Sequence, residues 1–245
     1  MKHLVEFHLP RVTSTNDYAR TLIAEHDFVM VTALFQTAGR GRNGRQWIGD
    51  HGANIYASFG ITHHHALTME DVSAYMARGA LSVYGAITNV LRDRDVRLKY
   101  PNDVQVSTVE GWAKIAGILV EHEFHGVRCA STIVGMGVNV EQEVFPETIT
   151  QLCTSLRRLG ISVGTQQILS AIRDSFVRYC EMPWQNVHRE WVEALRLDTV
   201  RVTLSDSTTP HAPLRVMHDG RLVLRNEDTQ HERIISDGDT LRYLD

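Results

Sequence analysis

The sequence predicts an α+β fold: a mixed, mainly antiparallel central sheet flanked by helices, followed by a small β-barrel module. Three observations predict it. Apolar residues recur at helical spacing from Thr68 to Leu91. Alternating apolar segments separated by turn residues follow from Val96 to Val140. Beyond that, the last stretch of about fifty residues contains only short strand patterns. We therefore expect a large domain of residues 1–195 and a small β-barrel domain of residues 196–245.

The composition is that of a soluble protein with an ordinary hydrophobic core. Of 245 residues, 43% are apolar and 22% are charged. A net charge of -4 and a pI of about 6.3 argue against general nucleic-acid binding, for which a basic domain is the rule. The three cysteines are scattered, and neither a signal peptide nor a membrane-spanning apolar run is present. We expect a cytoplasmic protein with no membrane partner.

The N-terminal part should alternate strands with helices. Strands are expected at Val5–Leu9, Phe28–Phe35 and Ala53–Ile61. Ser14, Thr15 and Asn16 precede helical spacing that begins at Asp17. Their short polar side chains either cap this helix or provide hydroxyl and amide groups beside a ligand.

The longest predicted helix follows Thr68, which has the spacing of a capping box with Asp71. Its apolar face should lie in the core, with Arg78 and Asn89 on the outer side.

The next strands should form a consecutive antiparallel meander, at Val96–Lys99, Val104–Ser107, Trp112–Glu121 and Val127–Val140. Helical patterns follow at Glu147–Leu159, Thr165–Glu181 and Trp184–Leu195. Short strands are then expected at Val200–Leu204, Pro213–Met217, Leu222–Leu224, Arg233–Ile235 and Thr240–Tyr243.

A glycine- and arginine-rich segment, Gln36–Tyr56, lies between two apolar strands. Glycine allows the backbone to approach a ligand closely, and arginine offers a fork of donors to phosphate or carboxylate. The segment, which contains Arg40, Arg42 and Arg45, is therefore typical of a mobile cationic loop that closes over an anion. A solvated hairpin tip and an RNA contact are the alternatives.

Lys114 lies in a strand whose two faces are both apolar. Strict alternation places Lys114 with Ala116 and Ile118 on one face, and Gly117 with Leu119 on the other. A buried ammonium needs a carboxylate, a phosphate or a lowered pKa, unless the side chain reaches water at the strand end.

The next strand carries Gly135, Gly137 and Asn139 on a single face. Glycines weaken a strand, so this face suggests a bare floor under a ligand, although a bulge or a covering helix would also explain it.

The strand end Lys99–Asp103 brings a cation, an amide and a carboxylate together around a proline. Three adjacent histidines, His63–His65, cannot all face one ion from a strand, so we assign no metal site to the protein. There is no Walker A motif, dinucleotide fingerprint or nucleophile signature. The remaining groups suit acyl adenylation, in which a carboxylate attacks the α-phosphorus of a nucleotide and cations stabilise the developing charge.

At these residues the chain resembles the biotin–protein ligases. The matching segments are Thr13–Asn16, Gln36, Gly39–Trp47, Gly52–Tyr56, Lys99–Asp103, Lys114–Glu121 and Gly135–Val140. The resemblance implies a class II aminoacyl-tRNA-synthetase-like catalytic domain and an SH3-like C-terminal barrel. It also implies a two-step reaction, in which biotin and MgATP give biotinyl-5′-adenylate and a lysine of a biotin carboxyl carrier protein then takes the biotin.

The resemblance assigns roles to residues. Lys114 and Arg40 would act in catalysis. The residues implied to bind biotin are Ser14, Thr15, Asn16, Gln36, Gly39, Arg40, Gly41, Arg42, Lys114 and Gly117. Those implied to bind ATP are Arg42, Arg45, Trp47, Lys99, Asn102 and Asn139. The cofactors and substrates implied are ATP, Mg²⁺ and biotin.

The chain departs from the family pattern at several positions. Asn43 replaces a basic residue, Tyr100 replaces tryptophan, and Ile48–His51 replaces a Ser-Pro step at the exit of the loop. Only about a dozen residues precede the Thr-Ser-Thr-Asn segment, too few for a DNA-binding domain, so we expect a monofunctional ligase without a DNA partner. Because sheet edges pair across subunits in this family, a homodimer is an option.

Three alternative functions remain open at this point. A lipoate or octanoate ligase shares the fold, and an RNA-binding protein could use the Arg-Gly segment. A pseudo-ligase that binds biotin without chemistry is the third, and the intact Lys114 and Arg40 argue against it.

Overall fold

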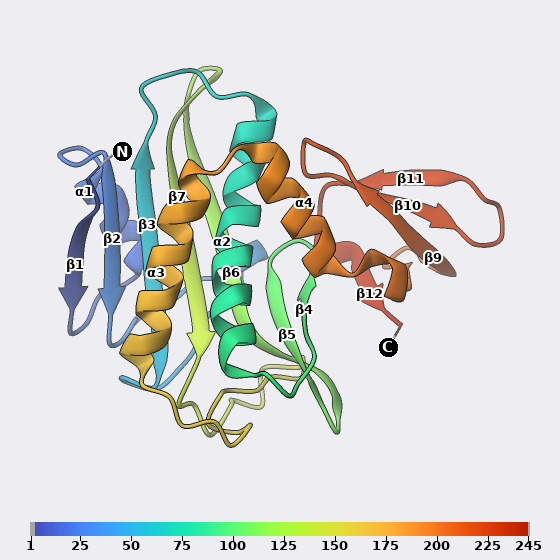
Figure 1. Ribbon diagram of the computed structural model, residues 1–245, viewed down its shortest axis with the longest axis horizontal. Helices are drawn as coiled ribbons and strands as arrows, with labels where there is room; N and C mark the ends of the chain where they lie inside the picture. Colours follow the sequence, from blue (N-terminus) through green and yellow to red (C-terminus); the bar gives the residue numbers. More distant parts are fainter. Residues whose placement is uncertain (1–2, 245) are drawn as a thin grey trace.

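The computed structural model describes residues 3–244 and contains a seven-stranded mixed sheet with helices on both faces (Figure 1). Its strands are β1 (Val5–Leu9), β2 (Phe28–Ala33), β3 (Asn54–Thr62), β4 (Val96–Lys99), β5 (Asp103–Thr108), β6 (Gly111–His125) and β7 (Arg128–Asn139). The strand order is β1-β2-β3-β7-β6-β5-β4, and only β1 and β2 are parallel. The predicted antiparallel meander from β4 to β7 is confirmed.

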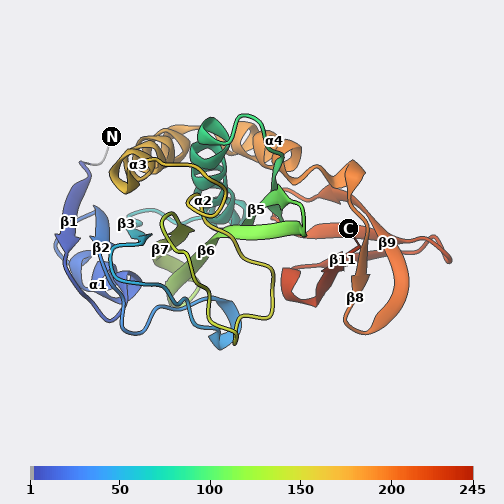
Figure 2. The same cartoon turned by 90° about the horizontal axis from the view of Figure 1, so that it is seen from below.

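One long helix, α2 (Met69–Val90), packs on the sheet together with α3 (Thr165–Glu181) and α4 (Trp184–Leu195), whereas α1 (Thr15–Leu22) covers the opposite face (Figure 1, Figure 2). The capping box at Thr68 is confirmed. The prediction that Arg78 points outward is wrong. Arg78 is buried, and its Nε donates to the carbonyl of Tyr179 at 3.0 Å, because α3 covers that side of α2.

The predicted helix at Glu147–Leu159 does not form. Its backbone instead pairs with the ends of β6 and β7: the amide of Lys114 donates to Leu152 at 2.8 Å, and the amide of Arg157 donates to Val140 at 2.8 Å. Because sheet ends satisfy these backbone groups, no helical bonds are needed. The fully buried Leu156 belongs to the main core, which explains the misleading apolar spacing.

A second antiparallel sheet lies at the C-terminal end of the chain. Its strands are β8 (Val202–Leu204), β9 (Ser207–Val216), β10 (Leu222–Asn226), β11 (Glu232–Ile235) and β12 (Leu241–Tyr243), in the order β11-β10-β9-β8-β12. Its buried side chains join the same hydrophobic core as those of the large sheet. The two sheets are also linked by hydrogen bonds, since the Tyr100 hydroxyl donates to Gly220 at 2.9 Å and the Tyr243 hydroxyl accepts from the Tyr100 amide at 3.1 Å.

The adjacent histidines point to separate partners. His63 Nε2 lies 2.8 Å from the Thr132 hydroxyl, and His64 Nε2 lies 2.7 Å from Asp27. Within residues 3–244, no group of three or more metal-ligating side chains is assembled, and no helix has the length and apolarity to cross a membrane.

Candidate functional site

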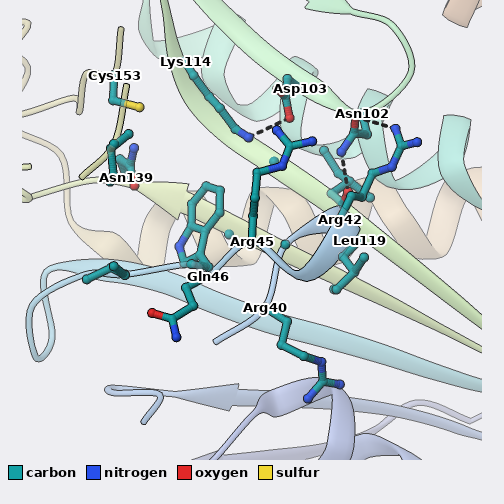
Figure 3. Close-up of a pocket in the computed structure, with 18 of the residues that line it drawn as sticks. Arg40, Arg42, Arg45, Gln46, Asn102, Asp103, Lys114, Leu119, Asn139 and Cys153 are labelled. Atoms are coloured by element: carbon teal, nitrogen blue, oxygen red, sulfur yellow. Dashed lines mark hydrogen bonds and ion pairs between the residues drawn. The ribbon is translucent and has the colours of Figure 1, made fainter. Parts of the chain in front are cut away.

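A cavity of about 450 Å³ lies on the α1 side of the large sheet (Figure 3). It is bounded by the start of α1, the Arg-Gly loop, β6, β7, the segment 145–153 and one turn of the C-terminal sheet. Most of the predicted site residues line it: Ser14, Thr15, Asn16, Gln36, Arg40, Gly41, Arg42, Arg45, Trp47, Asn102, Lys114, Gly117 and Asn139.

Two predicted site residues lie outside this lining. Gly39 is buried beneath the loop, where an added Cβ would lie 2.5 Å from the carbonyl oxygen of Trp47. Lys99 is directed toward the C-terminal sheet, with its Nζ 5.2 Å from the ring centroid of Tyr243. The structure therefore does not bring Lys99 together with the other predicted residues.

One end of the cavity is neutral and polar. The backbone amide and the hydroxyl of Thr15 donate to Gln36 Oε1 at 2.7 and 3.0 Å. Ser58 Oγ lies 2.7 Å from the Thr15 hydroxyl and 2.6 Å from Asn16 Oδ1. Ser14 occupies the cap position of α1, but its side chain makes no capping hydrogen bond. Ser14, Thr15 and Asn16 therefore contribute polar groups to the cavity as well as beginning α1. Ser58 adds a hydroxyl from β3 that no sequence pattern had marked.

Arg40 links the loop to α1 and β6. Its guanidinium donates to both oxygens of Asp17, at 2.6 and 2.7 Å, and to Glu121 at 3.4 Å. Glu121 also accepts from Asn16 at 2.7 Å and from Arg20 at 3.1 Å. Hydrogen bonding by Arg40 holds the pKa of Asp17 below its usual value, and the same bond raises the pKa of Arg40. Figure 3 shows Arg40 pointing away from Lys114, toward α1.

Lys114 is nearly buried and forms an ion pair with Asp103. Their side chains are 13% and 14% exposed, and Lys114 Nζ lies 2.8 Å from Asp103 Oδ1. Of the options that the sequence left open for Lys114, the structure shows a carboxylate partner. The predicted face of Lys114 is wrong, because the β5–β6 pairing shifts register and leaves Ile115 without a partner on β5. This bulge places Lys114 on the cavity side with Gly117.

The glycine floor carries the indole of Trp47. An added Cβ on Gly137 would collide with this ring, and one on Gly117 would lie 3.0 Å from it. A Cβ on Gly135 would collide with Asn16 Oδ1. The Trp47 ring centroid is also 5.4 Å from Lys114 Nζ. Within the described residues, the buried indole N–H of Trp47 has no hydrogen-bond acceptor.

Two asparagines are fixed at the edges of the floor. Asn139 Nδ2 donates to the carbonyl of Thr154 at 3.0 Å, and Asn102 Nδ2 donates to the carbonyl of Ile118 at 2.9 Å. Asn102 Oδ1 accepts from Arg42 at 3.2 Å. The segment that holds Asn139 contributes cavity residues that the sequence did not predict: Phe145, Thr148, Ile149, Thr150, Gln151 and Cys153. No motif marks this segment, and only its extended pairing with β6 brings it to the site.

The middle of the loop, Arg42–Arg45, faces the C-terminal sheet. Arg42 Nη2 lies 2.5 Å from Asp237 Oδ1, and Arg45 forms an ion pair with Asp239. Asn43, the residue that departs from the family pattern, donates to Asp239 at 2.6 Å. The sequence predicted short strands on either side of these two aspartates and no site residue between them.

The exit of the loop is also held in place. Asp50 and Gln142 form two hydrogen bonds, from the Asp50 amide at 2.9 Å and to its carboxylate at 3.0 Å, and Asn54 Nδ2 donates to Gln142 at 2.8 Å. The segment Ile48–His51, which departs from the family pattern, is therefore held by Gln142, just after β7.

The cavity thus combines a neutral hydrogen-bonding end, a flat floor under an aromatic ring, and an end with several cations. Such a site can bind an uncharged polar group at one end and phosphates at the other, and it can stabilise charge that develops between them.

Comparisons with known proteins agree on one family. The model of the "Biotin/lipoate A/B protein ligase family" matches residues 8–139, more than half of the chain. The bifunctional ligase/repressor BirA of Salmonella typhimurium is 31% identical over 169 residues, which cover 67% of this chain and 50% of that protein. The biotin–[acetyl-CoA-carboxylase] ligase of Mycobacterium tuberculosis is 31% identical over 173 residues, covering 67% and 58%. The chain thus spans about half the length of the curated relatives it matches.

A solved structure supports the fold over the whole chain. The Aquifex aeolicus biotin protein ligase in complex with biotin and ATP superposes with a TM-score of 0.68, at 22% identity, covering 100% of this chain and 99% of the other.

Proposed function

Because this chain belongs to the biotin/lipoate A/B protein ligase family, we propose that it joins biotin to a lysine of a biotin carboxyl carrier protein at the expense of ATP. In the first step, a biotin carboxylate oxygen attacks the α-phosphorus of ATP and displaces pyrophosphate. In the second, the lysine amine attacks the carbonyl carbon of the mixed anhydride, loses a proton and releases AMP.

The observation that carries this proposal is the arrangement of Lys114. A nearly buried ammonium lies over a glycine floor, between the polar end of the cavity and the arginine-bearing loop. Lys114 is expected to contact the biotin carboxylate and the reacting phosphate, where a preorganised cation stabilises the charge of the pentacoordinate transition state. Its ion pair with Asp103 holds the ammonium in position before substrates enter.

The polar end favours biotin over lipoate. The biotin ureido group has two N–H donors and a carbonyl acceptor, whereas the dithiolane of lipoate has no such groups. Thr15, Ser58 and Gln36 form a hydroxyl and amide cluster whose members bond to one another, and this polar lining suits a ureido group better than an apolar ring. This argument supports Ser14, Thr15, Asn16 and Gln36 as biotin ligands.

The nucleotide is expected at the opposite end. Trp47 offers a ring for the adenine above Gly117 and Gly137, while Arg42 and Arg45 offer donors to phosphates. Arg40, with Gly41, would close the loop over the adenylate from its anchor on Asp17.

Mg²⁺ would arrive with ATP as part of the substrate. The cavity carboxylates Asp103 and Asp239 are both paired with cations of the protein, and Mg²⁺ commonly bridges phosphates with few protein ligands. Lys99, directed toward Tyr243, is a weaker candidate for the ATP side than the sequence suggested.

Other features of the proposal concern the whole chain. We place the reaction in the cytoplasm, in line with three cysteines that form no disulfide. We further propose that residues 196–245 form an SH3-like barrel domain beside a catalytic domain of residues 1–195.

An RNA-binding role for the Arg-Gly segment is not favoured. Each of its three arginines is paired with a carboxylate of the chain itself: Arg40 with Asp17, Arg42 with Asp237 and Arg45 with Asp239. These carboxylates offset the positive charge that a groove along an RNA backbone needs, and the chain carries a net charge of -4.

The test is ATP-dependent incorporation of biotin into a purified carrier domain, followed by mass spectrometry of the acceptor lysine. Biotin-dependent pyrophosphate release, absent with lipoate or octanoate, is the expected companion result. Pyrophosphate release that depends on lipoate or octanoate instead would assign the chain to the other branch of the family. If none of the three acids causes pyrophosphate release, the proposal is wrong.

A further inference from the structure

A turn of the C-terminal sheet contributes a cavity residue that the proposed reaction does not yet use. This acidic turn, Asp237–Asp239, precedes β12, and Asp239 is part of the cavity lining. Its carboxylates contact the Arg-Gly loop, which comes from a distant part of the sequence.

The acidic turn is fixed before it meets the loop. Asp237 Oδ1 accepts from the Asp239 amide at 2.9 Å, which closes the turn. Gly238 packs against the strand end so closely that an added Cβ would collide with both Pro101 Cδ and the Tyr100 carbonyl oxygen. The turn is therefore seated on the segment that continues into Asn102 and Asp103.

Asp239 is the centre of the contacts with the loop. It forms an ion pair with Arg45, accepts from Asn43 at 2.6 Å and lies 3.5 Å from Arg42 Nη2. Asp237 adds a second carboxylate at 2.5 Å from Arg42. The side chains of Arg42 and Asp239 are 20% and 24% exposed, so water and salt screen this pair less than a fully exposed one, whereas Asp237 and Arg45 are 45% and 56% exposed.

These contacts leave donors of the arginines free within the described part of the chain. Arg42 uses Nη1 for Asn102 and Nη2 for the acidic turn, and Arg45 uses Nη2. A guanidinium carries five N–H donors, so the Nε–H of each remains available to an anion. Holding an arginine by one edge while another edge stays open reduces the ordering cost of binding.

We propose that the acidic turn is a positioning element for ATP: its carboxylates hold Arg42 and Arg45 so that their open donors face the nucleotide phosphates. The inference rests on the proposed function for its kinetic readout. Asp237 and Asp239 act through the arginines, and the biotin end is independent of them because Arg40 is held by Asp17 and Glu121.

The kinetic test compares Asp239→Asn with the wild type in biotin-dependent ATP–pyrophosphate exchange. Asparagine keeps the shape and removes the charge. The expected result is a KM for MgATP raised about tenfold, the loss typical of one charge-assisted contact, with the KM for biotin unchanged. Asp239→Glu should recover most of the loss. Asp206→Asn is the matched control, because Asp206 pairs with Arg233 on the same sheet, away from the cavity.

A second test needs no activity. An arginine-specific protease, added without substrates, should cleave the loop of the Asp237→Asn/Asp239→Asn variant about tenfold faster than the wild type. Mass spectrometry identifies cuts after Arg42 and Arg45. Failure of the wild type to catalyse exchange would count against the proposed function alone. Equal cleavage rates, or an unchanged or lowered KM for MgATP in Asp239→Asn, would overturn the positioning role.

Discussion

Replacing Lys114 by alanine tests the chemistry and the electrostatics of the site together. Loss of a preorganised cation is expected to slow adenylation by about 10²–10³-fold. The change also leaves the Asp103 carboxylate, 14% exposed, without its ammonium. Breaking a buried pair costs about 3 kcal/mol at the lower end of the usual range, which applies here because the pair retains some water contact. For a chain of this size, the Tm should fall by about 6–12 °C.

The two effects are separable. Asp103→Asn, added to Lys114→Ala, removes the uncompensated charge and should restore most of the Tm while adenylation stays low. Arg225→Ala serves as the control, since its pair with Glu232 is exposed and its loss should measurably change neither stability nor activity. Circular dichroism and pyrophosphate exchange give the two readouts. Adenylation at the wild-type rate in folded Lys114→Ala would refute the role of this residue.

Four further predictions concern the rest of the cavity. Arg40→Gly should release adenylate to solvent and label bystander lysines, as measured by biotin transfer to an unrelated protein; an undiminished lifetime of bound adenylate would contradict this. Gly137→Ala should displace the Trp47 indole, shift tryptophan fluorescence and raise the KM for MgATP but not for biotin. An unchanged fluorescence spectrum would contradict the contact between Gly137 and the indole ring. Gln36→Ala leaves the Thr15 donors without an acceptor and should raise the KM for biotin about tenfold, with little effect on that for MgATP. Asp17 has a pKa lowered chiefly by its hydrogen bond from Arg40, so its contribution to stability should be complete above its ordinary value of 3.8 and lost as the pH falls through the lower folded value. The stability difference between the wild type and Asp17→Asn, measured by urea unfolding, should therefore be constant at neutral pH and shrink in acid.

Much of the fold follows from local pattern. The strands of the large sheet and helices α2, α3 and α4 were predictable because each has a strong apolar period and clear turn or cap residues at its ends. The loop arginines, Lys114 and the glycine floor, which line the cavity, stood out in the sequence because charged residues and glycines are unusual within apolar strands and between them.

The remaining features depend on contacts that no local pattern encodes. Leu156 has helical spacing with its neighbours, yet backbone pairing with β6 and β7 decides the conformation of its segment. Ile115 looks like an ordinary strand residue, yet the bulge beside it reverses the facing of Lys114. The acidic turn reads as a loop, and only the docking of the second sheet brings Asp239 to the cavity.

The span of the cavity lining has a consequence for folding. Its residues run from Ser14 to Asp239, so the site is dominated by contacts between distant parts of the chain. Such high contact order slows folding, since each long loop must close before its contacts form. During synthesis, nearly all of this sequence must leave the ribosome before the pocket exists. On the proposed function, a nascent chain would therefore form no acyl-adenylate before the pocket that retains it exists.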